Sequence, residues 1–158
     1  MGASASCSKN KFYGFFKDAF NYDERKELCD KMIKENPKKL PIIVETIPEN
    51  GLPCTQKVLY MVARNTTILN LSQKLRKKLC LNHKQEENFM FIIMSCIGNA
   101  SIWRCPRKNE KLWNLYDDNK DSDGFFYIKM GNKEKINWNK LSEHCANYQN
   151  DLFSKPKA

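Results

Sequence analysis

Apolar residues recur along this chain at two periods, and the two periods predict both helices and strands. Between residues 22 and 35, apolar positions follow the steps of an amphipathic helix: Leu28, Cys29, Met32 and Ile33. Asn21 and Glu24 have the spacing of a capping box, which satisfies free amides at a helix start. The helix is expected to end at Asn36, because a residue before proline avoids helical backbone angles. The aromatic residues within 11–20 predict a shorter helix before it.

The rest of the pattern predicts strands around one more long helix. That helix begins near Thr66 and Thr67, and its apolar residues step by three and four: Ile68, Leu71, Leu75 and Leu79. Four segments rich in β-branched and aromatic residues predict strands: 40–47, 57–63, 89–95 and 125–130. Residues 96–111 are expected to form a loop, and a short helix follows around 112–116.

This order of elements predicts an α+β fold. A strand hairpin, a crossing helix and two further strands follow two helices, which is the order of a ubiquitin-like β-grasp with a four-stranded sheet. The chain has 158 residues, enough for one core with tails. We expect a flexible N-terminal tail (1–11), the ubiquitin-like domain with its two N-terminal helices (12–131) and a C-terminal extension (132–158).

Charge and composition narrow the class of protein. The net charge of +9 favours nucleic acid, anionic membranes or acidic peptides as partners, although a solvated lysine-rich surface is the simpler interpretation. No nucleic-acid-binding module pattern accompanies the charge. The seven cysteines include no Cys-x-x-Cys pair and there are two histidines, so we expect reduced thiols in a cytosolic protein and no metal. No phosphate loop, nucleophile arrangement, cofactor motif, signal segment or membrane span is recognisable, so an enzyme is the weakest class.

Three separated motifs, in the same order along the chain, resemble those of one family. They are Asn36-Pro-Lys-Lys-Leu-Pro-Ile-Ile-Val-Glu45, then Leu59-Tyr-Met-Val62 preceding Leu75-Arg-Lys-Lys-Leu-Cys-Leu81, and Lys120-Asp-Ser-Asp-Gly-Phe-Phe-Tyr-Ile128. The family is that of the autophagy-related ubiquitin-like modifiers, the light-chain-3 and GABARAP group. The resemblance covers about residues 12–130, and the segment 96–111 departs from it.

The resemblance implies a binding protein without enzymatic activity or a cofactor. Family members recruit cargo receptors and adaptors through an aromatic-x-x-aliphatic peptide that adds as a strand to the sheet. The implied aromatic pocket consists of Met32, Pro41, Ile43, Leu59, Met61 and Phe125. The implied aliphatic pocket consists of Tyr60, Val62, Ala63, Leu71 and Leu75. Lys57 and Lys78 are expected to face acidic residues of the peptide. Each apolar residue also has an ordinary interpretation as core.

Several positions depart from the family pattern. Leu59 stands where the family usually has lysine, and Ala63 where it has proline. The family is conjugated to lipid through a glycine about nine residues after its motif tyrosine, but here the last glycine is Gly131, which we expect at the sheet edge. We therefore expect an adaptor that is not conjugated in the standard way. The alternatives are a conventional lipid-conjugated modifier after C-terminal processing and a basic nucleic-acid-binding protein.

The two ends of the chain carry further signals. Met1-Gly-Ala-Ser-Ala-Ser6 fits the myristoylation pattern at Gly2, and Cys7 is placed for palmitoylation, so acylation could replace conjugation. The expected location is cytoplasmic, peripheral on autophagosomal or other vesicle membranes, with the autophagy machinery as partners. In the extension, helical steps of three and four join Trp138, Leu141, Cys145, Tyr148 and Leu152. This segment predicts either a helix that packs on the domain or, through Trp138-Asn-Lys-Leu141, a ligand for the peptide groove itself.

Overall fold

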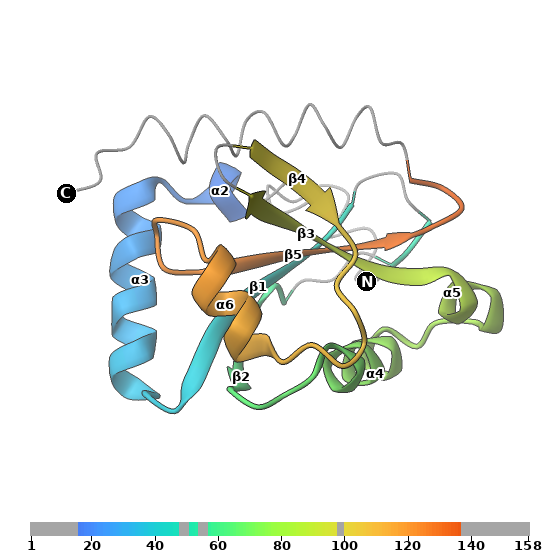
Figure 1. Cartoon of the computed structure of the whole chain (residues 1–158), viewed down its shortest axis with the longest axis horizontal. Coiled ribbons are helices and arrows are strands. Elements are labelled where there is room, and N and C mark those ends of the chain that lie inside the picture. Colours follow the sequence, from blue (N-terminus) through green and yellow to red (C-terminus); the bar gives the residue numbers. More distant parts are fainter. Residues whose placement is uncertain (1–15, 48–50, 54–56, 98–99, 137–158) are drawn as a thin grey trace, which may run out of the picture.

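The computed structural model describes residues 16–47, 51–53, 57–97 and 100–136, without the side chains of residues 96–101. Its centre is a five-stranded sheet with the order β2-β1-β5-β3-β4 (Figure 1). The strands are β1 (Lys39–Thr46), β2 (Leu59–Ala63), β3 (Phe89–Ile97), β4 (Ala100–Arg104) and β5 (Phe126–Asn132). β1 pairs in parallel with β5, whereas β1–β2, β3–β5 and β3–β4 are antiparallel. This is the mixed sheet of a ubiquitin-like α+β fold, as the order of elements predicted.

Five helices accompany the sheet in the described part of the chain. They are α2 (Phe16–Ala19), α3 (Tyr22–Glu35), α4 (Ile68–Leu79), α5 (His83–Asn88) and α6 (Leu112–Asn119). The capping box of Asn21 and Glu24 forms, and the Thr67 side chain caps α4 by accepting from the amide of Asn70. None of these helices is long and apolar enough to cross a membrane.

Two elements differ from the sequence prediction. The segment expected to be a loop contains β4, so the sheet has five strands rather than four. β4 pairs with β3 as an antiparallel hairpin, in which Ile93 faces Arg104 and Met94 faces Trp103. A five-residue edge strand with polar residues carries little periodic signal, which explains why the pattern missed it. The short helix α5 was also not predicted, and the capping box of Asn82 and Gln85 defines its start.

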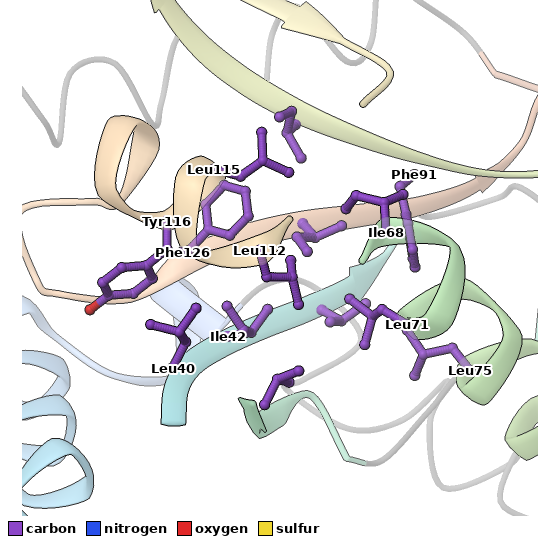
Figure 2. Packing of buried hydrophobic residues seen from close by; sticks show 14 of the residues in the cluster. Leu40, Ile42, Ile68, Leu71, Leu75, Phe91, Leu112, Leu115, Tyr116 and Phe126 are labelled. Atoms are coloured by element: carbon purple, nitrogen blue, oxygen red, sulfur yellow. The ribbon is translucent and has the colours of Figure 1, made fainter. Parts of the chain in front are cut away.

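The two faces of the sheet bury separate apolar clusters. On one face, Ile42 and Phe126 pack with Leu71 and Leu75 of α4 and with Leu112, Leu115 and Tyr116 of α6 (Figure 2). On the other face, Ile43 and Phe125 pack with Phe16 of α2 and with Leu28, Cys29 and Met32 of α3. Alternation along β1 separates the clusters, because Ile42 and Ile43 point to opposite faces.

Gly124 is required at the turn before β5. Its φ is +97°, which L-residues rarely adopt, and a Cβ there would lie 2.7 Å from the Cys29 sulfur. We expect Gly124→Ala to lower the free energy of unfolding by about 2–4 kcal/mol, from backbone strain and overpacking together. Urea unfolding of the variant and of the unsubstituted chain measures this difference in the free energy of unfolding. In a Cys29→Ala background the cost of Gly124→Ala should fall to about 1–2 kcal/mol, because only the backbone strain remains. Equal costs in both backgrounds would contradict the predicted contact.

Candidate functional site

Strand β2 forms one edge of the sheet. Its neighbour in the described sheet is β1, so the other side of its backbone makes no strand pairing there. The register pairs Leu59 with Ile43 and Met61 with Pro41 on one face. Tyr60 and Val62 alternate to the opposite face, where they pair with Ile42 and Leu40. An edge strand of this kind can accept an extended peptide as a further strand.

The residues predicted for the aromatic pocket come together beside β2. Met32 of α3 and Leu59 of β2 are partly buried and pack on Ile43 and Phe125, which are 0% exposed. Pro41 is buried in β1, and its partner Met61 is partly buried. α3 and β2 therefore offer partly exposed apolar side chains above a closed floor.

The residues predicted for the aliphatic pocket are brought together except for one. Tyr60, Val62, Leu71 and Leu75 belong to one cluster. Leu71 and Leu75 are 3% and 4% exposed, so they are part of the core floor. Ala63 is exposed at the end of β2, and the register places it with Leu59 and Met61 on the opposite face. Alternation along the strand therefore separates Ala63 from its predicted partners.

Two lysines flank Tyr60. The Lys57 amino nitrogen lies 5.0 Å from the centre of the Tyr60 ring, and that of Lys78 lies 5.3 Å from it. The Tyr60 hydroxyl donates to the Lys57 carbonyl at 3.1 Å. Both predicted lysines therefore lie at the same aromatic side chain of the edge strand, where cation–π attraction holds them.

Three residues that sequence analysis did not assign to either pocket pack with the residues predicted for the aromatic pocket. Phe16, Leu28 and Val58 pack in the same cluster as Met32 and Leu59. The i, i+4 spacing of Leu28 and Met32 signals a shared helix face and could have identified Leu28. Phe16 lies on α2, and its ring is 5.5 Å from that of Phe125, a long-range contact that local pattern does not reveal.

Buried polar contacts hold α2 and α3 against this side of the sheet. The Arg25 guanidinium donates to Asp123 at 2.9 Å and to the Phe20 carbonyl at 2.8 Å. Asp123 also accepts from the Phe125 amide and the Tyr127 hydroxyl. Burial raises the pKa of the Asp123 carboxyl despite these bonds, and burial beside Asp123 raises the pKa of the Tyr127 hydroxyl. These contacts tie α3 to the residue that follows α2 and to the turn before β5.

A second buried pair lies on the same face. Lys129 of β5 donates to Glu45 of β1 at 2.7 Å, and the side chains are 1% and 2% exposed. The other Glu45 oxygen accepts from the Phe16 amide at 2.5 Å, which anchors the start of α2. Burial lowers the pKa of the Lys129 amine, and the Glu45 carboxylate opposes this shift.

A separate cavity of about 460 Å³ lies between α4, α5 and β3. Its lining includes Ile68, Arg76, Phe91 and Cys105 and none of the residues predicted for the two pockets. Within the described residues there is also no group of three or more side chains suited to hold a metal ion.

Comparison with known proteins identifies the fold and the family. Residues 24–136 match the family model described as "Autophagy protein Atg8 ubiquitin like". The chain belongs to the Atg8 family. It is 28% identical over 113 residues to an autophagy-related protein 8-like protein of Dictyostelium discoideum, covering 72% of this chain and 85% of the relative. Autophagy-related protein 8h of Arabidopsis thaliana is likewise 28% identical over 113 residues, covering 72% of this chain and 87% of that protein.

A solved structure has the same fold. The crystal structure of Trypanosoma brucei ATG8 matches with a TM-score of 0.63 at 18% identity, covering 78% of this chain and 98% of that one. This Atg8-family chain is therefore a ubiquitin-like autophagy protein, in a family of modifiers that are generally not enzymes. The predicted resemblance and fold are confirmed.

The last glycine of this Atg8-family chain lies inside the sheet. Gly131 is buried in β5, where it pairs with Met90. β5 lies between β1 and β3, so the expectation that Gly131 sits at the sheet edge was wrong. The parallel pairing with β1 places β5 in the centre, which its position late in the chain does not reveal. Gly2, Cys7 and the segment 137–158 lie outside the described residues.

Proposed function

We propose that this Atg8-family protein binds aromatic-x-x-aliphatic peptides of cargo receptors and adaptors by strand addition to β2. The observation that carries the proposal is the edge position of β2, with Leu59 and Met61 on one face and Tyr60 on the other. A peptide strand paired with β2 presents alternate side chains to the two faces. Its aromatic anchor lies between Met32 and Leu59, above the floor of Ile43 and Phe125.

The aliphatic anchor of the peptide packs beside Tyr60 and Val62 on the opposite face. Leu71 and Leu75 form the floor there, because both are buried in the same cluster. Ala63 contributes at most through its backbone, since its side chain points to the other face. Full burial of a leucine or isoleucine side chain at such a site contributes about 1.5–3 kcal/mol to the free energy of peptide binding.

The test is an NMR titration of the full chain with an acidic peptide containing Trp-x-x-Leu. We expect the backbone amides of residues 57–63 to shift most, together with the methyl groups of Met32 and Met61. The control is the same peptide with alanine at both anchors, which should produce little shift. Shifts centred away from β2, or equal shifts with the control peptide, would rule out the proposed groove.

The lysines beside Tyr60 are expected to contribute affinity for acidic peptides. The double variant Lys57→Gln/Lys78→Gln should weaken binding of the acidic peptide about 3–10-fold at low salt. The effect should be smaller at high salt, because salt screens the attraction between exposed lysines and the acidic residues of the peptide. The matched control is Lys74→Gln/Lys84→Gln, which removes the same charge from exposed positions. Isothermal titration calorimetry at two salt concentrations measures the difference. Equal weakening by both pairs would mean that only net charge matters.

We further propose that membrane attachment uses N-terminal acylation at Gly2 and Cys7 rather than conjugation through Gly131. The burial of Gly131 in the central strand supports this, because conjugation there requires β5 to leave the sheet. A myristoyl chain binds a membrane weakly, and a second acyl chain or basic residues such as Lys9 and Lys11 make binding stable. Mass spectrometry of the native protein is expected to show acyl groups at Gly2 and Cys7. An unmodified N-terminus, or lipid on a glycine, would contradict the proposal.

A further inference from the structure

The sheet face that carries α3 holds a second apolar cluster toward its other edge. It consists of Ile47, Met90, Ile92, Trp103 and Ile136, and we call it the β3–β4 patch. None of these residues belongs to a helix. Ile92 is nevertheless 0% exposed, whereas Met90 and Trp103 are partly buried. In contrast, the α3 end of the same face is covered by helical residues such as Met32.

Neighbouring side chains extend the patch over two strands. Met94 alternates with Ile92 along β3 and pairs with Trp103 of β4, so all three lie on one face. The Trp103 indole nitrogen is buried and has no hydrogen-bond partner among the described residues. Ile92 also pairs with Lys129, so the patch adjoins the buried Glu45–Lys129 pair. An apolar sheet face of this kind needs a covering layer for stability.

The end of the described part of the chain lies at this face of the sheet. Ile136 is the last described residue, and its side chain already packs in the β3–β4 patch. The sequence continues with an amphipathic pattern: Trp138, Leu141, Cys145, Tyr148 and Leu152. As a helix, residues 138–152 extend about 22 Å, whereas neighbouring strands are about 4.8 Å apart. The segment is long enough to cover both β3 and β4 from the point where it begins.

We propose that residues 138–152 form an amphipathic helix that packs on the β3–β4 patch of the same chain. Its apolar stripe contacts Met94 and Trp103, and Glu143 and Asn150 face outward. The extension then continues the helical layer of α2 and α3 over the rest of the same sheet face, which this chain adds to the Atg8 fold. Because β4 and β2 are opposite edges of the sheet, the helix leaves the β2 groove open.

The same geometry argues against docking of Trp138-Asn-Lys-Leu141 in the groove of its own chain. Ile43, the neighbour of Leu59, lies four residues before Ile47 along β1, or about 13 Å. Across the sheet, three strand spacings separate Ile92 from β2, or about 14 Å. Trp138 follows Ile136 by two residues, which span at most about 7 Å. The aromatic residue therefore reaches the β3–β4 patch and not the peptide groove.

Methyl NMR on the full chain with labelled methionines tests the proposal. The six methionines include Met90 and Met94 in or beside the patch and Met32 and Met61 at the groove. We expect nuclear Overhauser contacts from the Trp138 or Tyr148 ring to the Met90 or Met94 methyl group. Contacts to Met32 or Met61, or no contacts to any methionine, would overturn it. Contacts that appear only between differently labelled chains in a mixed sample would assign the helix to a second copy and overturn it too.

A pair of matched variants supplies an independent measurement by hydrogen exchange. Leu141→Asp places a charge on the apolar stripe, and Asn139→Asp places the same charge on the outer face. In the unsubstituted chain, amides of 138–152 should be protected. Leu141→Asp should raise exchange of 138–152 and of β3–β4 together, at least about tenfold, while Asn139→Asp changes neither. The packing would be refuted if the amides of 138–152 were unprotected in the unsubstituted chain. It would also be refuted if Leu141→Asp left the hydrogen exchange of β3 and β4 unchanged. The peptide titration at β2 depends on neither result, so the two proposals fail separately.

Discussion

Replacing Glu45 with leucine is expected to lower the free energy of unfolding by about 3–5 kcal/mol, because it removes the carboxylate that lies against the buried Lys129 amine. The Lys129 nitrogen is 2.7 Å from Glu45, and both side chains are almost fully buried. The variant also removes the acceptor of the Phe16 amide. We therefore expect α2 to detach from the sheet first, which urea unfolding combined with hydrogen exchange measures.

The double variant Glu45→Leu/Lys129→Met separates the two causes. Both charges are then gone, so we expect most of the stability to return, with a remaining loss of about 1–3 kcal/mol from the unpaired Phe16 amide. The exposed pair of Lys26 and Asp30 is the matched control, and Lys26→Met should change stability by less than about 1 kcal/mol. If Glu45→Leu and the double variant were equally unstable, the buried charge would not be the cause.

The contrast between α3 and β4 shows what local pattern can predict. The start of α3 follows from Asn21 and Glu24, and both capping hydrogen bonds form as their spacing implies. Strand β2 was also predicted, within 57–63, since a run of apolar residues and the order of elements both point to a strand there. β4 was missed because its pairing with β3, rather than its own composition, defines it.

The pairing register of strands that are distant in the sequence determines the contacts at the site that the sequence pattern did not predict. The strand pattern of Phe125 to Met130 shows a lysine among apolar residues, but its partner Glu45 is 84 residues away. Only the parallel pairing of β1 with β5 brings the two together. Ala63 is the opposite case, because the two-residue period of β2 already separates it from Tyr60 and Val62. Resemblance supplied the pocket residues, and strand geometry sorts them between two faces.

Leu59→Asp is expected to weaken binding of the acidic Trp-x-x-Leu peptide about 30–100-fold, or 2–3 kcal/mol. The reason is twofold. Leu59 packs with Met32 and Phe125 where the aromatic anchor is proposed to lie, so the substitution removes apolar contact. It also places a carboxylate beside an acidic ligand, which adds repulsion. Calorimetry gives the affinity, and the amide spectrum confirms that the variant keeps its fold.

Leu69→Asp is the matched control, since Leu69 of α4 is 36% exposed and lines the separate cavity rather than the β2 groove. The same change of leucine to aspartate there should leave peptide affinity within about twofold, because only long-range charge differs. Comparable losses from both variants would show that net charge governs binding. Retained affinity in Leu59→Asp would place the aromatic anchor elsewhere. A loss confined to Leu59→Asp ties recognition to the apolar side of β2, where an edge strand and α3 meet over a closed core.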